Sequence, residues 1–202
     1  MTAPFTYPVM ERFPTLQGEG AWTGHAAWFI RLGGCDVGCS WCDVKESWPL
    51  EAHPRVDVST LVQEAVASGL PRVVVTGGEP TMHDLGPLTE ALKAEGLATH
   101  LETSGTGAVS GQWDWVTLSP KKFKACQEAW YSQANELKVV VVNSHDLEWA
   151  EEHAAKIQTG TAMFLQPEWD RREEVMERVL NRIQEAPQWR LSLQTHRFIG
   201  LP

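Results

Sequence analysis

Short apolar runs alternate along the chain with segments whose apolar positions repeat at helical spacing. The predicted strands cover residues 26–32, 72–76, 98–102, 115–118, 137–142, 161–166 and 189–194. Helices are predicted between Asp57 and Gly69, over about 84–95 and 144–158, and after a cap at Asp170. Strands that alternate with helices form right-handed βαβ units, so we expect an α/β protein with a mostly parallel sheet.

The number of strands limits the architecture. A closed barrel of eight β/α units typically needs ~250 residues, whereas this chain has 202 residues. We therefore expect a single domain over residues 1–202 that forms an open, partial β/α barrel. Ligands bind at the carboxyl ends of the strands in such sheets. Polar motifs stand at four of these ends, at residues 33–43, 77–80, 102–105 and 119–121.

Charge and composition argue against some partners. The formal net charge is −9, which disfavours a polyanion such as nucleic acid as the main ligand. No apolar run reaches the length of a membrane-spanning helix, and the first residues lack the pattern of a secretion signal. We expect a cytoplasmic protein that binds neither nucleic acid nor a membrane.

Three of the four cysteines, Cys35, Cys39 and Cys42, lie close together in a CxxxCxxC spacing. Three thiolates on one tight loop can hold three corners of a [4Fe–4S] cube and leave one iron open. The alternative is a structural zinc site with Cys126 or a histidine as its fourth ligand. Zinc sites usually combine two ligand pairs, and no second pair exists here, so we favour the cluster. Cys126 is then expected to be an ordinary helix residue.

A second motif, Gly77-Gly78-Glu79-Pro80, follows the next predicted strand. Glycines at a strand end also occur in plain tight turns. One strand after a CxxxCxxC loop, however, this GGEP motif resembles that of the radical S-adenosylmethionine (SAM) superfamily. The resemblance implies a partial barrel in which the open iron chelates the methionine part of SAM. An electron from the cluster then splits a carbon–sulfur bond, and the resulting 5′-deoxyadenosyl radical abstracts hydrogen from a substrate.

The resemblance also implies which residues contact SAM, because later strand ends match the places where these enzymes meet the cofactor. No catalytic side chain is assigned beyond the ligands of the cluster and SAM. The implied SAM-binding residues are Trp41, Cys42, Asp43, Gly78, Glu79, Glu102, Ser104, Ser119, Pro120, Lys121 and Gln166.

Two further segments narrow the family. They are Thr15-Leu16-Gln17-Gly18-Glu19-Gly20 and the stretch 193–202, LQTHRFIGLP. Together with Cys42-Asp43 and Ser119-Pro120-Lys121, they resemble the 7-carboxy-7-deazaguanine synthases of queuosine biosynthesis. That resemblance implies a lyase that converts 6-carboxy-5,6,7,8-tetrahydropterin to 7-carboxy-7-deazaguanine. The radical would take the hydrogen at C6, the ring would contract, ammonia would leave, and SAM would be regenerated.

Such a family member would bind its substrate with a segment at about 12–24 and a capping tail at about 193–202. The implied substrate residues are Leu16, Gln17, Gly18, Glu19, Arg31, Thr76, His196 and Pro202. Glu19 can accept from an amino-pyrimidine edge, and Arg31 can fork onto a carboxylate. The alternatives are an exposed loop carboxylate for Glu19, a structural ion pair for Arg31 and a core position for His196.

One position departs from the family pattern. Members commonly carry Thr or Ser after the Cys-Asp pair, where the hydroxyl ligates Mg²⁺, but this chain has Val44. Valine offers no oxygen to a hard cation, so we expect a weaker or altered dependence on Mg²⁺. The family further implies a reducing partner such as flavodoxin, and a homodimer.

Two other functions remain open from the sequence. A glycyl-radical activating enzyme also carries CxxxCxxC, but the segments 15–20 and 193–202 argue against it. A zinc-stabilised binding module without chemistry would leave the GGEP motif and the other strand-end motifs without a role.

Overall fold

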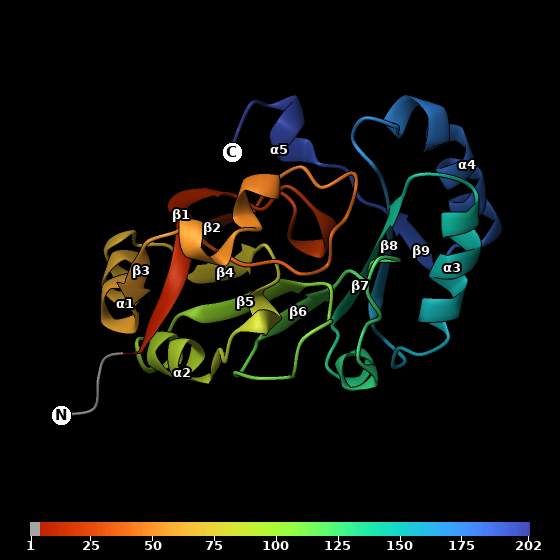
Figure 1. Cartoon of the computed structure of the whole chain (residues 1–202). Helices are drawn as coiled ribbons and strands as arrows, with labels where there is room; N and C mark the ends of the chain where they lie inside the picture. Colours follow the sequence, from red (N-terminus) through yellow and green to blue (C-terminus); the bar gives the residue numbers. More distant parts are fainter. Residues whose placement is uncertain (1–4) are drawn as a thin grey trace.

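The computed structural model describes residues 5–202, whose strands form one open sheet (Figure 1). The strand order is β3-β1-β2-β4-β5-β6-β7-β8-β9. Neighbours from β2 to β9 are parallel, while β1 is antiparallel to both β2 and β3. The strands are β1 Thr6–Leu16, β2 Ala26–Leu32, β3 Arg55–Asp57, β4 Arg72–Gly77, β5 Ala98–Thr103, β6 Trp115–Leu118, β7 Glu136–Val141, β8 Ala162–Pro167 and β9 Trp189–Leu191. The predicted open, mostly parallel α/β fold is confirmed.

The outer face of this sheet is covered by α1 Val58–Ala67, α2 Gly86–Ala94, α3 His145–Ala154 and α4 Arg172–Glu185. The short α5 Thr195–Phe198 lies at the cavity described below, where its His196 is part of the wall. Short 3-10 turns are η1 Gly20–Trp22, η2 Lys45–Ser47, η3 Leu50–Ala52, η4 Pro80–Met82 and η5 Glu128–Ser132. The predicted cap of α1 is present, since the Asp57 carboxylate accepts from the Thr60 N–H at 2.9 Å. None of the helices in the described chain is long and apolar enough to cross a membrane.

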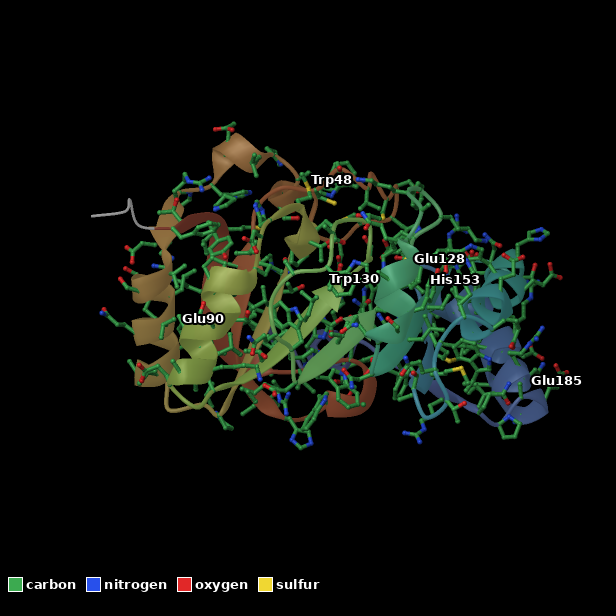
Figure 2. The ribbon with its side chains drawn as sticks, turned by 90° about the horizontal axis from the view of Figure 1, so that it is seen from below. Trp48, Glu90, Glu128, Trp130, His153 and Glu185 are labelled. Atoms are coloured by element: carbon green, nitrogen blue, oxygen red, sulfur yellow. The ribbon has the colours of Figure 1, made fainter. Side chains whose placement is uncertain are left out.

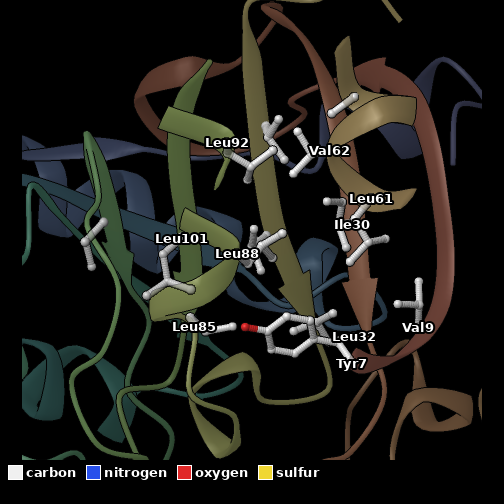
Figure 3. Packing of buried hydrophobic residues seen from close by; sticks show 14 of the residues in the cluster. Tyr7, Val9, Ile30, Leu32, Leu61, Val62, Leu85, Leu88, Leu92 and Leu101 are labelled. Carbon is white, nitrogen blue, oxygen red and sulfur yellow. The ribbon is translucent and has the colours of Figure 1, made fainter. Parts of the chain in front are cut away.

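Side-chain alternation along each strand separates a helix-covered face from an inner face. On β2, Ile30 and Leu32 enter the core with α1 and α2 (Figure 3). Arg31, between them in the sequence, lines the cavity on the other side of the sheet. A second apolar cluster joins β7 and β8 to α3 and α4. Figure 1 shows the two helix pairs over different parts of the sheet. The inner face holds the polar residues described below, and among the helices of the described chain only the short α5 contributes to the cavity there.

Five features differ from the sequence prediction. The prediction missed β1, because prolines at Pro8 and Pro14 interrupt its pattern, and it missed the short β3. Asp170 does not cap α4, since Glu168 accepts from the N–H groups of Asp170 and Arg171 at 3.2 and 3.0 Å. The last strand ends at Leu191 rather than at 194. Cys126 lies in the loop before η5, not in a helix.

Candidate active site

The carboxyl ends of the parallel strands surround one cavity, and nearly all predicted site residues lie in its wall. Pro120 is the exception, because it is buried but does not line the cavity. The predicted residues in the wall are Leu16, Gln17, Gly18, Glu19, Arg31, Cys35, Cys39, Trp41, Cys42, Asp43, Thr76, Gly78, Glu79, Glu102, Ser104, Ser119, Lys121, Gln166, His196 and Pro202. Residues far apart in the sequence therefore meet at one site.

The cysteine loop follows β2 and is held by backbone bonds to η2. The N–H groups of Gly34 and Cys35 donate to the carbonyls of Ser47 and Trp48 at 2.8 and 3.1 Å. The indole N–H of Trp48, labelled in Figure 2, donates to Cys42 Sγ at 3.4 Å. Three free thiols thus face one cavity on a braced loop.

The donor set suits an iron–sulfur cluster. In residues 5–202, no three His, Cys, Asp or Glu side chains converge tightly enough to hold a single metal ion. A cube needs no such convergence, because each iron takes its own thiolate. Burial raises the pKa of Cys39 to about 11, although Lys121 opposes the shift. A cluster would supply the positive charge that favours the thiolate there.

Cys126 does not join the three loop cysteines. It is not part of the cavity wall, and its thiol lies near the Gln127 carbonyl at 3.4 Å. A Cβ added at Gly105 would lie 2.7 Å from Cys126 Sγ, so this thiol packs closely beneath the loop that follows β5. Its position does not support the zinc alternative in which Cys126 is the fourth ligand.

Glu79 of the GGEP motif joins the ends of β4 and β5. Its carboxylate is 2% exposed and accepts from the Thr81 N–H at 3.0 Å, the Thr103 hydroxyl at 2.5 Å and the Ser104 N–H at 2.8 Å. The hydroxyls of Thr81 and Ser104 donate to it as well. Glu79 therefore fixes the geometry of two strand ends besides lining the cavity, a role that the sequence did not indicate.

Lys121 and Trp41 form another part of the wall. The Lys121 ammonium donates to the carbonyl and hydroxyl oxygens of Ser119 at 2.7 and 2.5 Å, and it lies 5.7 Å from the centre of the Trp41 ring. At the end of β8, Gln166 accepts from the Ser192 hydroxyl at 2.7 Å. These contacts hold polar groups of three strand ends in fixed positions.

The segment 193–202 lies against residues 17–19. The N–H and the hydroxyl of Thr195 both donate to the Gly18 carbonyl at 2.9 Å. The Arg197 guanidinium binds Asp43 at 3.0 Å, next to the last loop cysteine. His196 packs on Gly18, and burial lowers the pKa of its imidazole. The tail therefore bridges the cysteine loop and the segment after β1.

Arg31 and Thr76 stand side by side in the wall, in register on β2 and β4. The Arg31 Nε donates to the Glu11 carboxylate at 2.5 Å, so the ion pair considered from the sequence exists. Within the described residues, the terminal nitrogens of Arg31 make no hydrogen bond. The guanidinium therefore keeps a free edge in the cavity even though its Nε is paired.

The sequence analysis missed Lys138, which lies in the wall with its ammonium bound to both Glu19 and Glu102. Leu137, Val139 and Val141 enter the outer core, so the period of two along β7 could have placed Lys138 inside. The sequence analysis predicted the strand 137–142 but assigned no role to Lys138. Other wall residues that were not predicted are Phe13, Phe29, Val37, Trp48, Gly77, Thr103, Val140, Glu168, Trp169 and Gln194.

The ammonium of Lys138 favours the ionised form of the neighbouring Glu102 carboxylate. Burial would raise the pKa of Glu102, but Lys138, and then His100, lower it to about 2. Burial likewise disfavours the Lys138 ammonium, yet Glu102 and Glu19 raise its pKa above the ordinary value. Glu19 is no exposed loop carboxylate, since its side chain is 16% exposed and also accepts from Gln194 at 2.9 Å.

Val44 lines the cavity beside Asp43. Its side chain brings no oxygen to the place where a hydroxyl was expected from the family pattern. Asp43 is the nearest acidic residue in the sequence, and it is already paired with Arg197.

The fold and cavity are those of a radical SAM enzyme, and the profile of the radical SAM superfamily matches residues 29–129. The chain is 55% identical to 7-carboxy-7-deazaguanine synthase from Synechocystis sp. over 97% of this chain and 94% of that protein. It is 34% identical to the synthase of Escherichia coli K12 over 96% and 99%. The crystal structure of QueE from Escherichia coli superposes with a TM-score of 0.82 at 36% identity, covering 95% of each chain. The chain belongs to the 7-carboxy-7-deazaguanine synthase family.

Proposed function

We propose that this chain converts 6-carboxy-5,6,7,8-tetrahydropterin to 7-carboxy-7-deazaguanine, with loss of ammonia. The observation that carries this proposal is that the cysteine loop, residues 16–19 and the tail 194–202 contribute to the wall of one cavity. Radical chemistry at a cluster requires the substrate to lie in the same cavity. Both family-specific segments line the cavity that the cysteines line, and Arg197 of the tail binds Asp43 beside Cys42. Membership of the family supports the same reaction.

Cys35, Cys39 and Cys42 would hold the [4Fe–4S] cluster, and SAM would lie between the loop and the ends of β4 to β8. When bound, the cluster and SAM would supply the radical chemistry that removes the hydrogen at C6. The side chains of the cavity wall would bind SAM and orient it. Trp41, Lys121, Glu102, Ser104 and Gln166 lie in the wall of the cavity. There, Trp41 and Lys121 would flank SAM, and Glu102, Ser104 and Gln166 would offer polar groups to it. Glu79 holds the strand ends on which these groups stand.

The pterin would lie between residues 16–19 and the tail. Backbone groups of Leu16, Gln17 and Gly18 can read the flat edge of the ring, and Glu19 can accept from its amino group. The free edge of Arg31 can bind the substrate carboxylate, with the Thr76 hydroxyl beside it. In this arrangement the segment 12–24 binds the substrate, and the tail 193–202, with His196 and Pro202 in the wall, closes the cavity over it.

We further propose the conditions in which the enzyme works. A cytoplasmic reductant such as flavodoxin would provide the electron for each radical event, because the reaction requires a reduced cluster. Val44 favours a weak dependence on Mg²⁺. We also propose a homodimer, which the resemblance noted in the sequence implies.

The carboxylate of the substrate offers the sharpest test of this proposal. The reconstituted, reduced protein is incubated without oxygen with SAM and either 6-carboxytetrahydropterin or tetrahydropterin without the carboxylate. We expect conversion of the first compound only, and a loss of kcat/KM of roughly 100-fold or more in Arg31→Met. Arg178→Met, at an exposed position of α4, is the control. Equal activity of Arg31→Met and wild type would refute this binding mode.

A further inference from the structure

Four wall residues form a closed ring of hydrogen bonds. The Lys138 ammonium donates to Glu102 Oε2 at 2.9 Å and also to Glu19 Oε2. The Gln17 side-chain amide donates to Glu102 Oε1 at 3.0 Å, and its oxygen accepts from the Glu19 N–H at 3.1 Å. The ring thus joins the end of β5, the middle of β7 and the segment that follows β1.

The two carboxylates of this ring belong to different parts of the cavity. Glu102 precedes the Thr-Ser-Gly turn on the side assigned to SAM, and Glu19 lies on the side assigned to the pterin. Glu19 also accepts from Gln194, so the tail is attached to the same ring. One residue, Lys138, contacts both carboxylates directly.

The position of Lys138 means that its loss would affect both the SAM side and the pterin side of the cavity. Its side chain is 5% exposed, and those of Glu19 and Glu102 are 16% and 15% exposed. Without the ammonium, two carboxylates would face a shared region of low polarity with no cation between them. Like charges in such a region repel and reorient.

We propose that Lys138 is a positioning residue that couples the two halves of the cavity, so that SAM and the pterin strengthen each other's binding. The coupling rests on the proposed function for the identity of the two ligands. A ligand that fixes Glu102 also fixes Lys138 and Gln17, and through them Glu19. The second ligand then has less side-chain freedom to restrict, and the effect is reciprocal.

Equilibrium binding tests the coupling without turnover. The dissociation constant of SAM is measured on the cluster-loaded protein with and without saturating 6-carboxytetrahydropterin, in the absence of reductant. We expect the pterin to tighten SAM binding of the wild type by about fivefold or more. The measured quantity is the ratio of the SAM dissociation constants without and with the pterin. Lys138→Met should reduce this ratio to nearly one, and Lys138→Arg should restore part of the wild-type ratio. Lys93→Met, which removes an ion pair to Asp114 outside the cavity, should keep the wild-type ratio.

A second variant covers the case in which Lys138→Met does not fold. The double variant Lys138→Met/Glu102→Gln removes the cation together with one anion, and the Gln17 contact can persist because glutamine keeps an accepting oxygen. It should fold and bind SAM more weakly than the wild type, because Glu102 lies on the SAM side. The ratio of the SAM dissociation constants without and with the pterin should be near one. A wild-type ratio in either folded variant would overturn the role of Lys138. Wild type that binds both ligands with no coupling would refute this inference alone, whereas failure of the wild type to bind the pterin would refute the proposed function as well.

Discussion

Gly18 and His196 are in such close contact that no side chain fits between them. A Cβ added at Gly18 would lie 2.0 Å from His196 Nδ1, far below any normal contact distance. The glycine in the segment after β1 is therefore what allows the tail to lie on that segment. The hydrogen bonds from Thr195 to the Gly18 carbonyl act at the same place.

Gly18→Ala should displace the tail and disturb the pterin site while leaving the cluster intact. We expect kcat/KM for the pterin to fall roughly 10- to 100-fold, because a shift of about 1 Å in a positioning element has effects of that size. Gly86→Ala, in the first turn of α2 and outside the cavity, is the matched control. An unchanged kcat/KM in Gly18→Ala would show that the contact of tail and segment does not shape the site.

Glu79→Gln should destabilise the strand ends. The carboxylate accepts hydrogen bonds from Thr81, Thr103 and Ser104, and an amide NH₂ would face some of these donors without accepting from them. Leaving buried donors unpaired should lower the free energy of unfolding by about 2 kcal/mol. Thermal unfolding measures the loss, with the exposed Glu90→Gln on α2 as control (Figure 2). Equal melting temperatures for both variants would contradict this structural role.

The valine after the Cys-Asp pair predicts a weak response to Mg²⁺. Adding Mg²⁺ to chelator-treated wild type should change turnover by less than about twofold, since Val44 offers no ligand. Val44→Thr restores a hydroxyl at this place and should increase the stimulation. Turnover at a series of Mg²⁺ concentrations compares the two proteins. A strict requirement for Mg²⁺ in the wild type would count against this interpretation.

The burial of Glu136 should make the stability of the folded chain depend on pH. It is 1% exposed, and burial raises its pKa from 4.5 to about 7 against the opposing charge of Lys138. The folded chain therefore keeps this proton longer than the unfolded chain, so the contribution of Glu136 to stability falls as pH rises from about 4.5 through about 7.

Glu136→Gln removes this titration and can still accept from the Ala21 N–H. We expect the variant to match the wild type near pH 4.5 and to be more stable by about 3 kcal/mol at pH 8. Melting temperatures of both proteins across this range provide the comparison. A difference that does not change with pH would mean that Glu136 does not titrate in this range.

The features that could be predicted from the sequence are those that depend on a few neighbouring residues. The strand 26–32 and the cap at Asp57 agree with the structure, because apolar alternation and capping chemistry act over a few residues. The strand-end rule correctly brought the motifs to one cavity. By contrast, β1 was not predicted, because Pro8 and Pro14 interrupt its pattern. Its formation depends on pairing with β2 and β3.

Other features depend on partners distant in sequence. Lys138 looked like one polar residue in a valine-rich strand, and its role follows from Glu19 and Glu102, which are 119 and 36 positions away. The many hydrogen bonds of Glu79 likewise join two strands that only the fold brings together. No local pattern carries such information.

The central claim is a cluster on the three loop cysteines that drives conversion of the pterin. The most direct measurement is product formation by mass spectrometry after anaerobic incubation of reconstituted, reduced protein with SAM and 6-carboxytetrahydropterin. We expect 7-carboxy-7-deazaguanine from the wild type and from Cys126→Ala, whose thiol lies outside the cavity, and none from Cys39→Ala. A wild type that cleaves SAM but leaves the pterin intact would contradict the proposed substrate. Undiminished product from Cys39→Ala would contradict the cluster assignment.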